Sequence, residues 1–133
     1  MPDYIEKRRY PRIFFPAGQR VEAEIVHEAS GWNLAVTLLD ISEGGMGLRL
    51  KRNADVSIVP GEHIRLEAIH GQPYLRSLSQ ILMEVRWVLD DDFFDYIALG
   101  CQFLDLPEKD RELLQDFTLL ARAAGKEELG GDA

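Results

Sequence analysis

The chain has 133 residues, of which 46% are hydrophobic and 29% charged, and it carries a formal net charge of −8. This length fits one domain and leaves no room for a second, and the composition excludes a disordered or fibrous chain. The negative charge disfavours binding of DNA or RNA, because a field of this sign repels polyanions. The charge is uneven, however: residues 1–12 have a net charge of +2, which leaves −10 for the rest.

The N-terminus and the single cysteine indicate a cytoplasmic protein. No apolar run precedes a small-residue cleavage site, and nowhere do 18 consecutive apolar residues occur. Cys101 has no partner for an internal disulfide, as is usual in a reducing compartment. We therefore expect a cytoplasmic location and no insertion into a membrane.

A flexible arm and three strands are predicted in the first part of the chain. Residues 1–12 are polar and charged, contain two prolines, and predict a flexible basic arm. Alternating apolar and acidic residues predict a strand over about 20–27, and an apolar, β-branched run predicts another over 32–39. A tight turn within 40–47 joins this strand to a third, in which Met46, Leu48 and Leu50 resume the alternation. The three glycines of the turn are expected to supply positive φ angles and close backbone contacts.

Three further strands follow a connecting loop. Alternating apolar residues predict them over about 64–68, 81–89 and 97–103. The acidic loop 90–95 lacks the ligand spacing of a calcium site, so we expect a solvated hairpin tip. Trp87 alternates in phase with the apolar residues of its strand, which favours a place in the core. Six strands at hairpin spacing indicate a mainly antiparallel sheet that is closed or nearly closed.

The last part of the chain has the period of a helix, over about 107–124. Its apolar residues recur at helical spacing, with Pro107 expected at the first helical position and Gly125 just beyond the end. The apolar stripe comprises Leu113, Leu114, Phe117, Leu120, Ala121 and Ala124. We expect this stripe to cover an open end or seam of the sheet, and residues 125–133 to be a frayed tail.

No residue pattern indicates catalysis or metal binding. His27, His63 and His70 lie on predicted strands without metal-ligand spacing, and no hydrolase or phosphate-loop motif is present. Cys101 lies in an alternating apolar strand, where a small buried hydrophobe is expected rather than a nucleophile. We therefore expect no enzyme, no catalytic residue, no metal and no cofactor.

Two short elements are chemically complementary to an anionic guanine nucleotide. Arginine side chains bind phosphate and the O6 and N7 edge of guanine, and their planes stack on bases. A carboxylate accepts hydrogen bonds from the N–H groups of guanine, a serine can donate or accept beside it, and a glycine allows close backbone approach. The residues concerned are Arg8, Arg9 and Arg12 in the arm, with Asp40, Ser42 and Gly45 at the predicted turn. Taken singly, each element has a plainer interpretation, as a basic tail or as a set of turn formers.

Together the two elements resemble the RxxxR and [DN]xSxxG signature of PilZ domains, the bacterial receptors for cyclic di-GMP. The matching stretches are RRYPR at 8–12 and DISEGG at 40–45, without substitution. The likeness extends over roughly residues 6–124. It implies a mainly β fold: a six-stranded antiparallel split β-barrel with a C-terminal amphipathic helix packed on it, formed by residues 13–124 behind the arm.

The resemblance also implies where the ligand lies, on the outer surface of the barrel. Arg8 and Arg12 would hold phosphate and guanine, with Arg9 beside them, and the residues of the second motif would hold the other guanine contacts. Trp87 stands where some family members place an aromatic side chain against the ligand, which is the alternative to its place in the core. Lys7 lies directly before RxxxR, and a basic residue at that position slightly favours binding of a stacked pair of ligands over a single one.

We therefore predict a non-catalytic effector that binds cyclic di-GMP and relays it to a downstream protein through ordering of the arm. One alternative is a PilZ-like adaptor that binds a protein partner without nucleotide. Another is a small hydrolase acting on an anionic substrate, for which the sequence offers no pairing of nucleophile and base.

Overall fold

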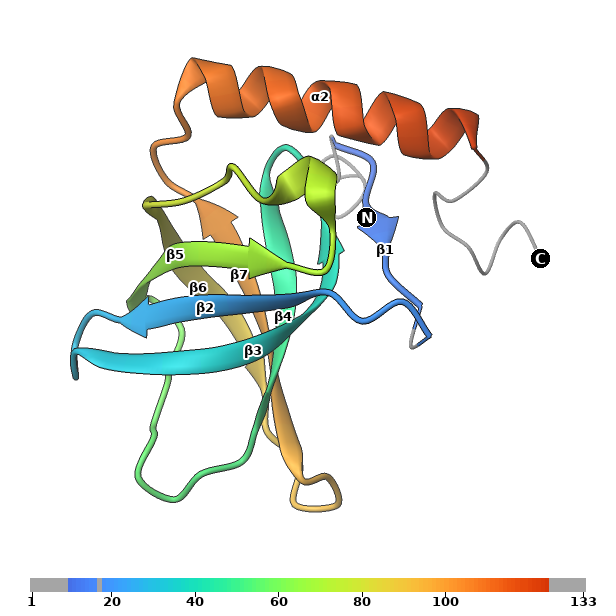
Figure 1. Cartoon of the computed structure of the whole chain (residues 1–133). Coiled ribbons are helices and arrows are strands. Elements are labelled where there is room, and N and C mark those ends of the chain that lie inside the picture. Colours follow the sequence, from blue (N-terminus) through green and yellow to red (C-terminus); the bar gives the residue numbers. More distant parts are fainter. Residues whose placement is uncertain (1–9, 17, 125–133) are drawn as a thin grey trace, which may run out of the picture.

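Antiparallel β-strands and one long helix account for most of the structure (Figure 1). The computed structural model describes residues 10–16 and 18–124, so most of the expected arm and all of the expected tail lie outside the described residues. The strands are β1 (Ile13–Phe14), β2 (Glu22–His27), β3 (Trp32–Ile41), β4 (Gly45–Lys51), β5 (His63–His70), β6 (Ile81–Leu89) and β7 (Tyr96–Phe103). The helical elements are the 3-10 turn η1 (Pro73–Leu75) and the helix α2 (Glu108–Ala123). The mainly β fold with a C-terminal helix is confirmed.

Six of the strands close into a barrel, and β1 adds to its edge. The order along the sheet is β1-β3-β2-β5-β6-β7-β4, and β4 pairs again with β3 to complete the ring. All of these pairs are antiparallel, as predicted. The sequence did not indicate β1, because two residues are too few to show alternation. Its Ile13 is nonetheless buried and pairs with Ile41 of β3.

The barrel interior is filled by the apolar residues of the alternating strands. In β2 the side chains of Ala23 and Ile25 are buried, while Glu22 and Glu24, which alternate with them, are exposed. In β7 the predicted inward residues, Ile97, Leu99, Cys101 and Phe103, are all buried. The period-two pattern therefore identified the inner face of these strands correctly.

A β-bulge in β3 changes which side chains face outward. The pairing with β4 shifts between Leu38 and Asp40, so that one extra residue lies in β3. Leu38 and Ile41 are both buried in the core, although they are three positions apart. Because a one-residue insertion reverses the alternation, Asp40 projects from the outer face instead of the inner one.

A second bulge, in β6, has the same effect on Trp87. The pairing with β7 shifts between Val85 and Trp87; Val85 is buried, and Val88 packs against the core. Trp87 and Leu89 are 46% and 57% exposed. The interpretation of Trp87 as a core residue in phase with Val85 is therefore wrong, because the extra residue at Arg86 moves Trp87 to the outer face.

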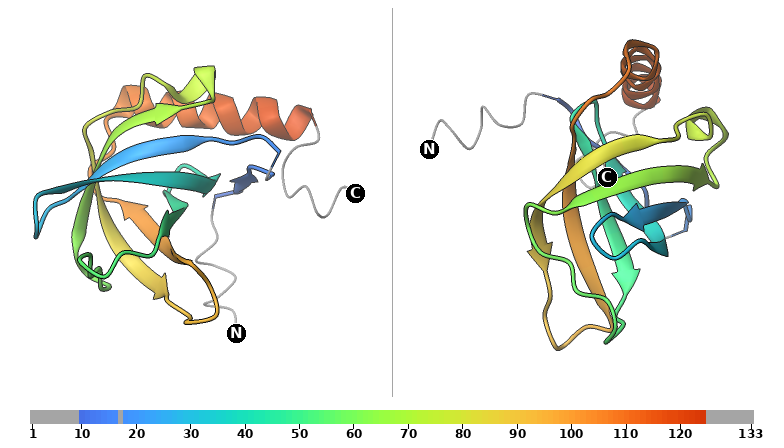
Figure 2. Two further views of the ribbon diagram at one scale, coloured as in Figure 1. Left: turned by 60° about the horizontal axis from the view of Figure 1, so that its bottom comes forward. Right: turned by 90° about the vertical axis from the view of Figure 1, so that its left-hand side faces the viewer.

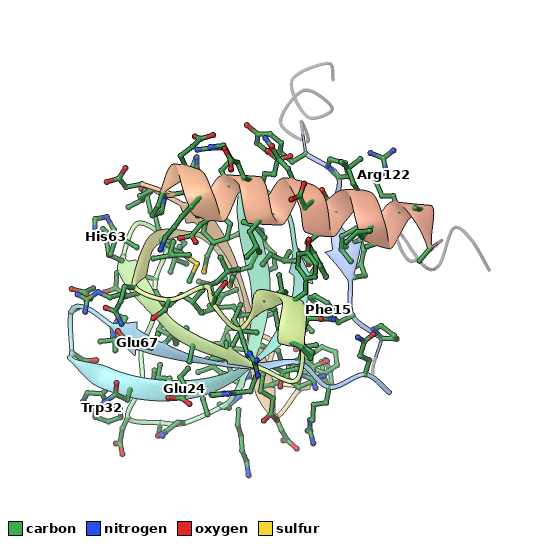
Figure 3. All side chains as sticks on the ribbon, turned by 45° about the horizontal axis from the view of Figure 1, so that its top comes forward. Phe15, Glu24, Trp32, His63, Glu67 and Arg122 are labelled. Carbon is green, nitrogen blue, oxygen red and sulfur yellow. The ribbon has the colours of Figure 1, made fainter. Side chains whose placement is uncertain are left out.

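Helix α2 lies across one end of the barrel (Figure 2). Its inner side is formed by Leu114, Phe117 and Ala121, which are buried. The ring of Phe117 lies between two other aromatic rings, with centroid distances of 6.4 Å to Phe15 and 5.6 Å to Tyr74 of η1. Phe15, labelled in Figure 3, comes from the segment just after β1. The predicted covering of an open barrel end by the helix is thus present.

The helix differs from the prediction in two details. Pro107 is the N-cap residue, one position before the first helical residue, and not the first residue of the helix. Leu120 is 56% exposed and Ala124 is exposed, so the buried stripe is narrower than the apolar spacing suggested. In the described part of the chain, no helix has the length and apolar character needed to cross a membrane.

Candidate functional site

One row of paired residues crosses four strands on the outer face of the barrel. Asp40 of β3 pairs with Gly47 of β4, Gly47 with Gly100 of β7, and Gly100 with Trp87 of β6. Directly opposite residues of antiparallel strands project to the same face. The register therefore places an acidic and an aromatic side chain at the two ends of a row whose centre has no side chains. We call these four residues the platform.

The two glycines allow the side chains of the platform to lie low on the barrel wall. A Cβ atom on Gly47 would lie 2.6 Å from Oδ2 of Asp40, and one on Gly100 would lie 2.0 Å from Nε1 of Trp87. The carboxylate and the indole thus occupy the space that larger residues would fill. The platform is consequently flat, with the Trp87 indole partly open to solvent, which suits stacking of a planar base.

Arg12 stands beside the acidic end of the platform. Strand β1 pairs Phe14 with Asp40, and this pairing brings the nearby Arg12 Nη1 to 3.7 Å from Asp40 Oδ2. The guanidinium also lies 5.9 Å from the centre of the Phe14 ring. The side chains of Arg12 and Asp40 are 33% and 13% exposed, so the ion pair is partly shielded from solvent. The structure thus unites one residue from each half of the predicted signature.

The turn between β3 and β4 carries the rest of the second motif. The N–H of Ser42 donates to the carbonyl of Gly45 (2.9 Å), and the Ser42 hydroxyl accepts from the N–H of Gly44 (3.0 Å). Tyr10, from within RxxxR, lies against this turn, since a Cβ on Gly44 would be 3.0 Å from its ring. The end of the arm is therefore directed along the signature hairpin.

The glycines of this turn serve close approach and not an unusual backbone conformation. A Cβ on Gly45 would lie 2.0 Å from the carbonyl oxygen of Cys101, so Gly45 lets β4 and β7 approach each other. The expectation of positive φ angles in this segment is wrong. Glycines with positive φ lie at other turns of the described chain, at Gly31, Gly61 and Gly71. Contact of Gly45 with a ligand stays a prediction.

The remaining candidates are distributed as follows. Lys7, Arg8 and Arg9 lie outside the described residues. Burial raises the pKa of the Cys101 thiol to about 12, which keeps it protonated and a poor nucleophile at neutral pH. His27 is buried, with Nε2 2.9 Å from Glu62 Oε1, which is the ordinary environment of a structural histidine. Within residues 10–16 and 18–124, no group of three or more metal-ligating side chains is assembled.

The sequence pattern predicts Gly47 only as one of the three turn glycines, and it predicts no role for Gly100. A glycine in the middle of an apolar strand often marks a site where another group approaches the backbone closely, and Gly100 within LGCQF has this character. That signal could have identified the centre of the platform. The two bulges that place Asp40 and Trp87 on the outer face leave no such trace in the sequence.

An antiparallel barrel with a helix across one end, a short hairpin signature and a site on its outer wall defines a class of small β-barrel domain. The family comparison identifies it: residues 6–120 match the PilZ domain, and the chain belongs to this family. None of the curated proteins matches the sequence significantly.

Solved structures share the fold. The chain is similar to MrkH of K. pneumonia in its complex with c-di-GMP, with a TM-score of 0.66, 21% identity and coverage of 90% of this chain and 53% of that one. For the PilZ domain of YcgR from Escherichia coli with c-di-GMP the TM-score is 0.62 and the identity 23%, with coverage of 90% of this chain and 96% of that one. For the Bacillus subtilis inhibitor of motility MotI/DgrA the TM-score is 0.65 and the identity 16%, with coverage of 88% of this chain and 52% of that one. The chain thus spans about half the length of MrkH and MotI and nearly all of the isolated YcgR domain.

Proposed function

We propose that this protein is a non-catalytic effector that binds cyclic di-GMP on the platform. The observation that carries the proposal is the strand register, which brings Arg12, Asp40 and Trp87 to one patch of the outer wall. Membership of the PilZ family supports it, as does the shared fold with the YcgR domain, whose structure was solved with c-di-GMP.

The side chains of the platform and of the neighbouring arm can each contact a guanine dinucleotide. The Asp40 carboxylate accepts from the N–H groups of one guanine, and the exposed face of Trp87 stacks on a base. Arg12 leaves Asp40 for phosphate or the guanine edge, and Arg8 and Arg9, with Lys7, add further cations. The net charge of −8 does not oppose this, because charges beyond a Debye length of about 8 Å are largely screened. For long polyanions the same charge remains unfavourable, so we propose no DNA or RNA ligand.

We further propose that the ligand is relayed through the arm. Contacts of the nucleotide with the three arginines of residues 8–12 would order the arm against the barrel and create a surface for a downstream protein. Tyr10 supports this direction, because its ring already lies against the signature turn at Gly44.

Calorimetric titration with cyclic di-GMP tests the proposal. We expect the wild-type chain to bind, and Asp40→Ala to lower affinity at least about tenfold, since a hydrogen bond to a charged group contributes about 1.5–3 kcal/mol. Gly100→Ala should also weaken binding, because its methyl group displaces the indole that lies 2.0 Å from the new Cβ position. Asp116→Ala is the matched control: it removes the same charge from an exposed position of α2.

The outcomes separate the two candidate functions. Equal binding by Asp40→Ala and Asp116→Ala would exclude the platform as the ligand site. Absence of heat from the wild-type chain at high micromolar nucleotide would refute the receptor function and favour an adaptor that binds a protein partner without nucleotide.

A further inference from the structure

The outer face of the barrel continues beyond the platform in a second row. Two positions further along the same strands, Ala98 of β7 pairs with Arg49 of β4 on one side and with Leu89 of β6 on the other. Neighbouring rows on one face are about 6.6–6.8 Å apart. Ala98 has only a methyl group and is 8% exposed, so its own side chain adds little height to the wall between Gly100 and Arg49. A ligand broader than one base that lies on the platform therefore extends toward Arg49.

Arg49 is held in place by an aromatic stack. Its guanidinium carbon lies over the ring of Tyr96, 4.8 Å from the ring centre. Tyr96 in turn stacks on Phe94, with centroids 5.3 Å apart and ring planes 26° apart. Across the described part of the chain, Arg49 has no hydrogen-bond or ion-pair partner, so the aromatic stack is the contact that positions its guanidinium there.

The hairpin that carries this stack is braced from behind by Arg52. Its backbone N–H donates to the carbonyl of Asp95 at 2.7 Å. Its side chain donates to the carbonyl oxygens of Phe94, from Nε at 3.2 Å, and of Asp91, from Nη2 at 2.7 Å, and forms an ion pair with Asp90. Because the loop is fixed by these bonds, little conformational entropy is left to lose when a ligand settles on the stack.

We propose that Arg49 and Tyr96 form a second base-binding subsite, which takes the guanine of the nucleotide that the platform does not hold. One face of the planar guanidinium lies over Tyr96. Arg49 is half-buried, so the part that is open to solvent can stack on a base. The subsite rests on the proposed function, since it requires cyclic di-GMP on the platform. A surface Arg–Tyr pair can also be a purely structural contact; its continuity with the platform favours the binding role.

Titration of variants at this subsite with cyclic di-GMP tests the inference. A stacked base contributes about 1–3 kcal/mol, so Arg49→Ala and Tyr96→Ala should each weaken binding by roughly fivefold to 150-fold. Arg49→Lys should be as weak as Arg49→Ala, because an ammonium group has no plane to stack, whereas Tyr96→Phe keeps the ring and should bind like wild type. Arg65→Ala, on β5, removes the same charge from a strand that contributes nothing to the platform, and should bind within twofold of wild type.

Thermal unfolding verifies that each variant is folded. Arg49 makes no hydrogen bond among the described residues, so we expect its replacement to leave the fold intact. If the wild-type chain binds and Arg49→Ala binds within twofold of it, the subsite is refuted while the proposed function stands. Recovery of wild-type affinity by Arg49→Lys would also overturn it, because charge alone would then account for the effect. If the wild-type chain does not bind, the proposed function fails and the subsite with it.

Discussion

Gly45 belongs to the predicted ligand signature, yet the structure gives it a role inside the barrel wall, and the variant Gly45→Ala measures that role. The new Cβ would lie 2.0 Å from the carbonyl oxygen of Cys101, a distance that real Cβ atoms do not adopt, so β4 and β7 must separate by about 1 Å. The backbone hydrogen bond from Phe103 to Gly44, 2.9 Å long, joins the two strands beside this point. Losing it costs about 1 kcal/mol, and the strain of overpacking adds about 1–3 kcal/mol.

We therefore expect Gly45→Ala to lower the free energy of unfolding by about 3 kcal/mol, a large part of the total for a domain of this size. Urea unfolding followed by circular dichroism measures it. Gly18→Ala is the matched control, because no atom lies within 4 Å of its added Cβ and its φ is not positive. If the free energy of unfolding of Gly45→Ala lies within about 0.5 kcal/mol of wild type, as is usual for surface substitutions, the close approach of β4 and β7 does not require glycine at this position.

Two further predictions concern ionisable groups. The hydrogen bond with His27, followed by that from the backbone of Val59, lowers the pKa of Glu62 below its ordinary value of 4.5. The stability that this lowered pKa provides is complete above pH 4.5 and is lost as the pH falls through the pKa of the folded state. The urea midpoint should therefore fall more steeply with decreasing pH for wild type than for Glu62→Gln. Equal slopes would contradict the assignment. Because burial raises the pKa of Cys101 to about 12, the native thiol should react with iodoacetamide far more slowly than the urea-unfolded chain, and equal rates would show that the thiol is accessible.

The fold was accessible from the sequence wherever alternation was regular. In β2 and β7 each inward residue follows its neighbour by two positions, and the predicted inner faces are the buried ones. The change of period at Pro107 marked the helix to within one residue of its start. The signature motifs predicted that Arg12 and Asp40 lie close together, and their side chains are 3.7 Å apart although 27 residues separate them in the sequence.

The rest depended on contacts between strands, which a single strand's pattern does not contain. The bulge before Trp87 is visible only as a shift of pairing between β6 and β7, so alternation alone placed this residue inside the barrel. The roles of Gly47 and Gly100 likewise depend on the side chains of other strands that lie over them. Strand β1 is recognisable only from its pairing with β3. Sequence patterns thus predicted most of the strands and the helix, whereas the residues of the platform follow from the register between the strands.

The glycine centre of the platform limits how recognition can diverge in relatives of this protein. At Gly47 and Gly100 any larger residue collides with the carboxylate or the indole above it, so these two positions admit almost no variation while the platform is kept. The positions around the rim, such as 49 and 89, project away from the barrel wall and are free of that restriction. If the platform holds the ligand as we propose, changes in ligand preference can therefore accumulate at the rim, residue by residue, without redesign of the platform itself.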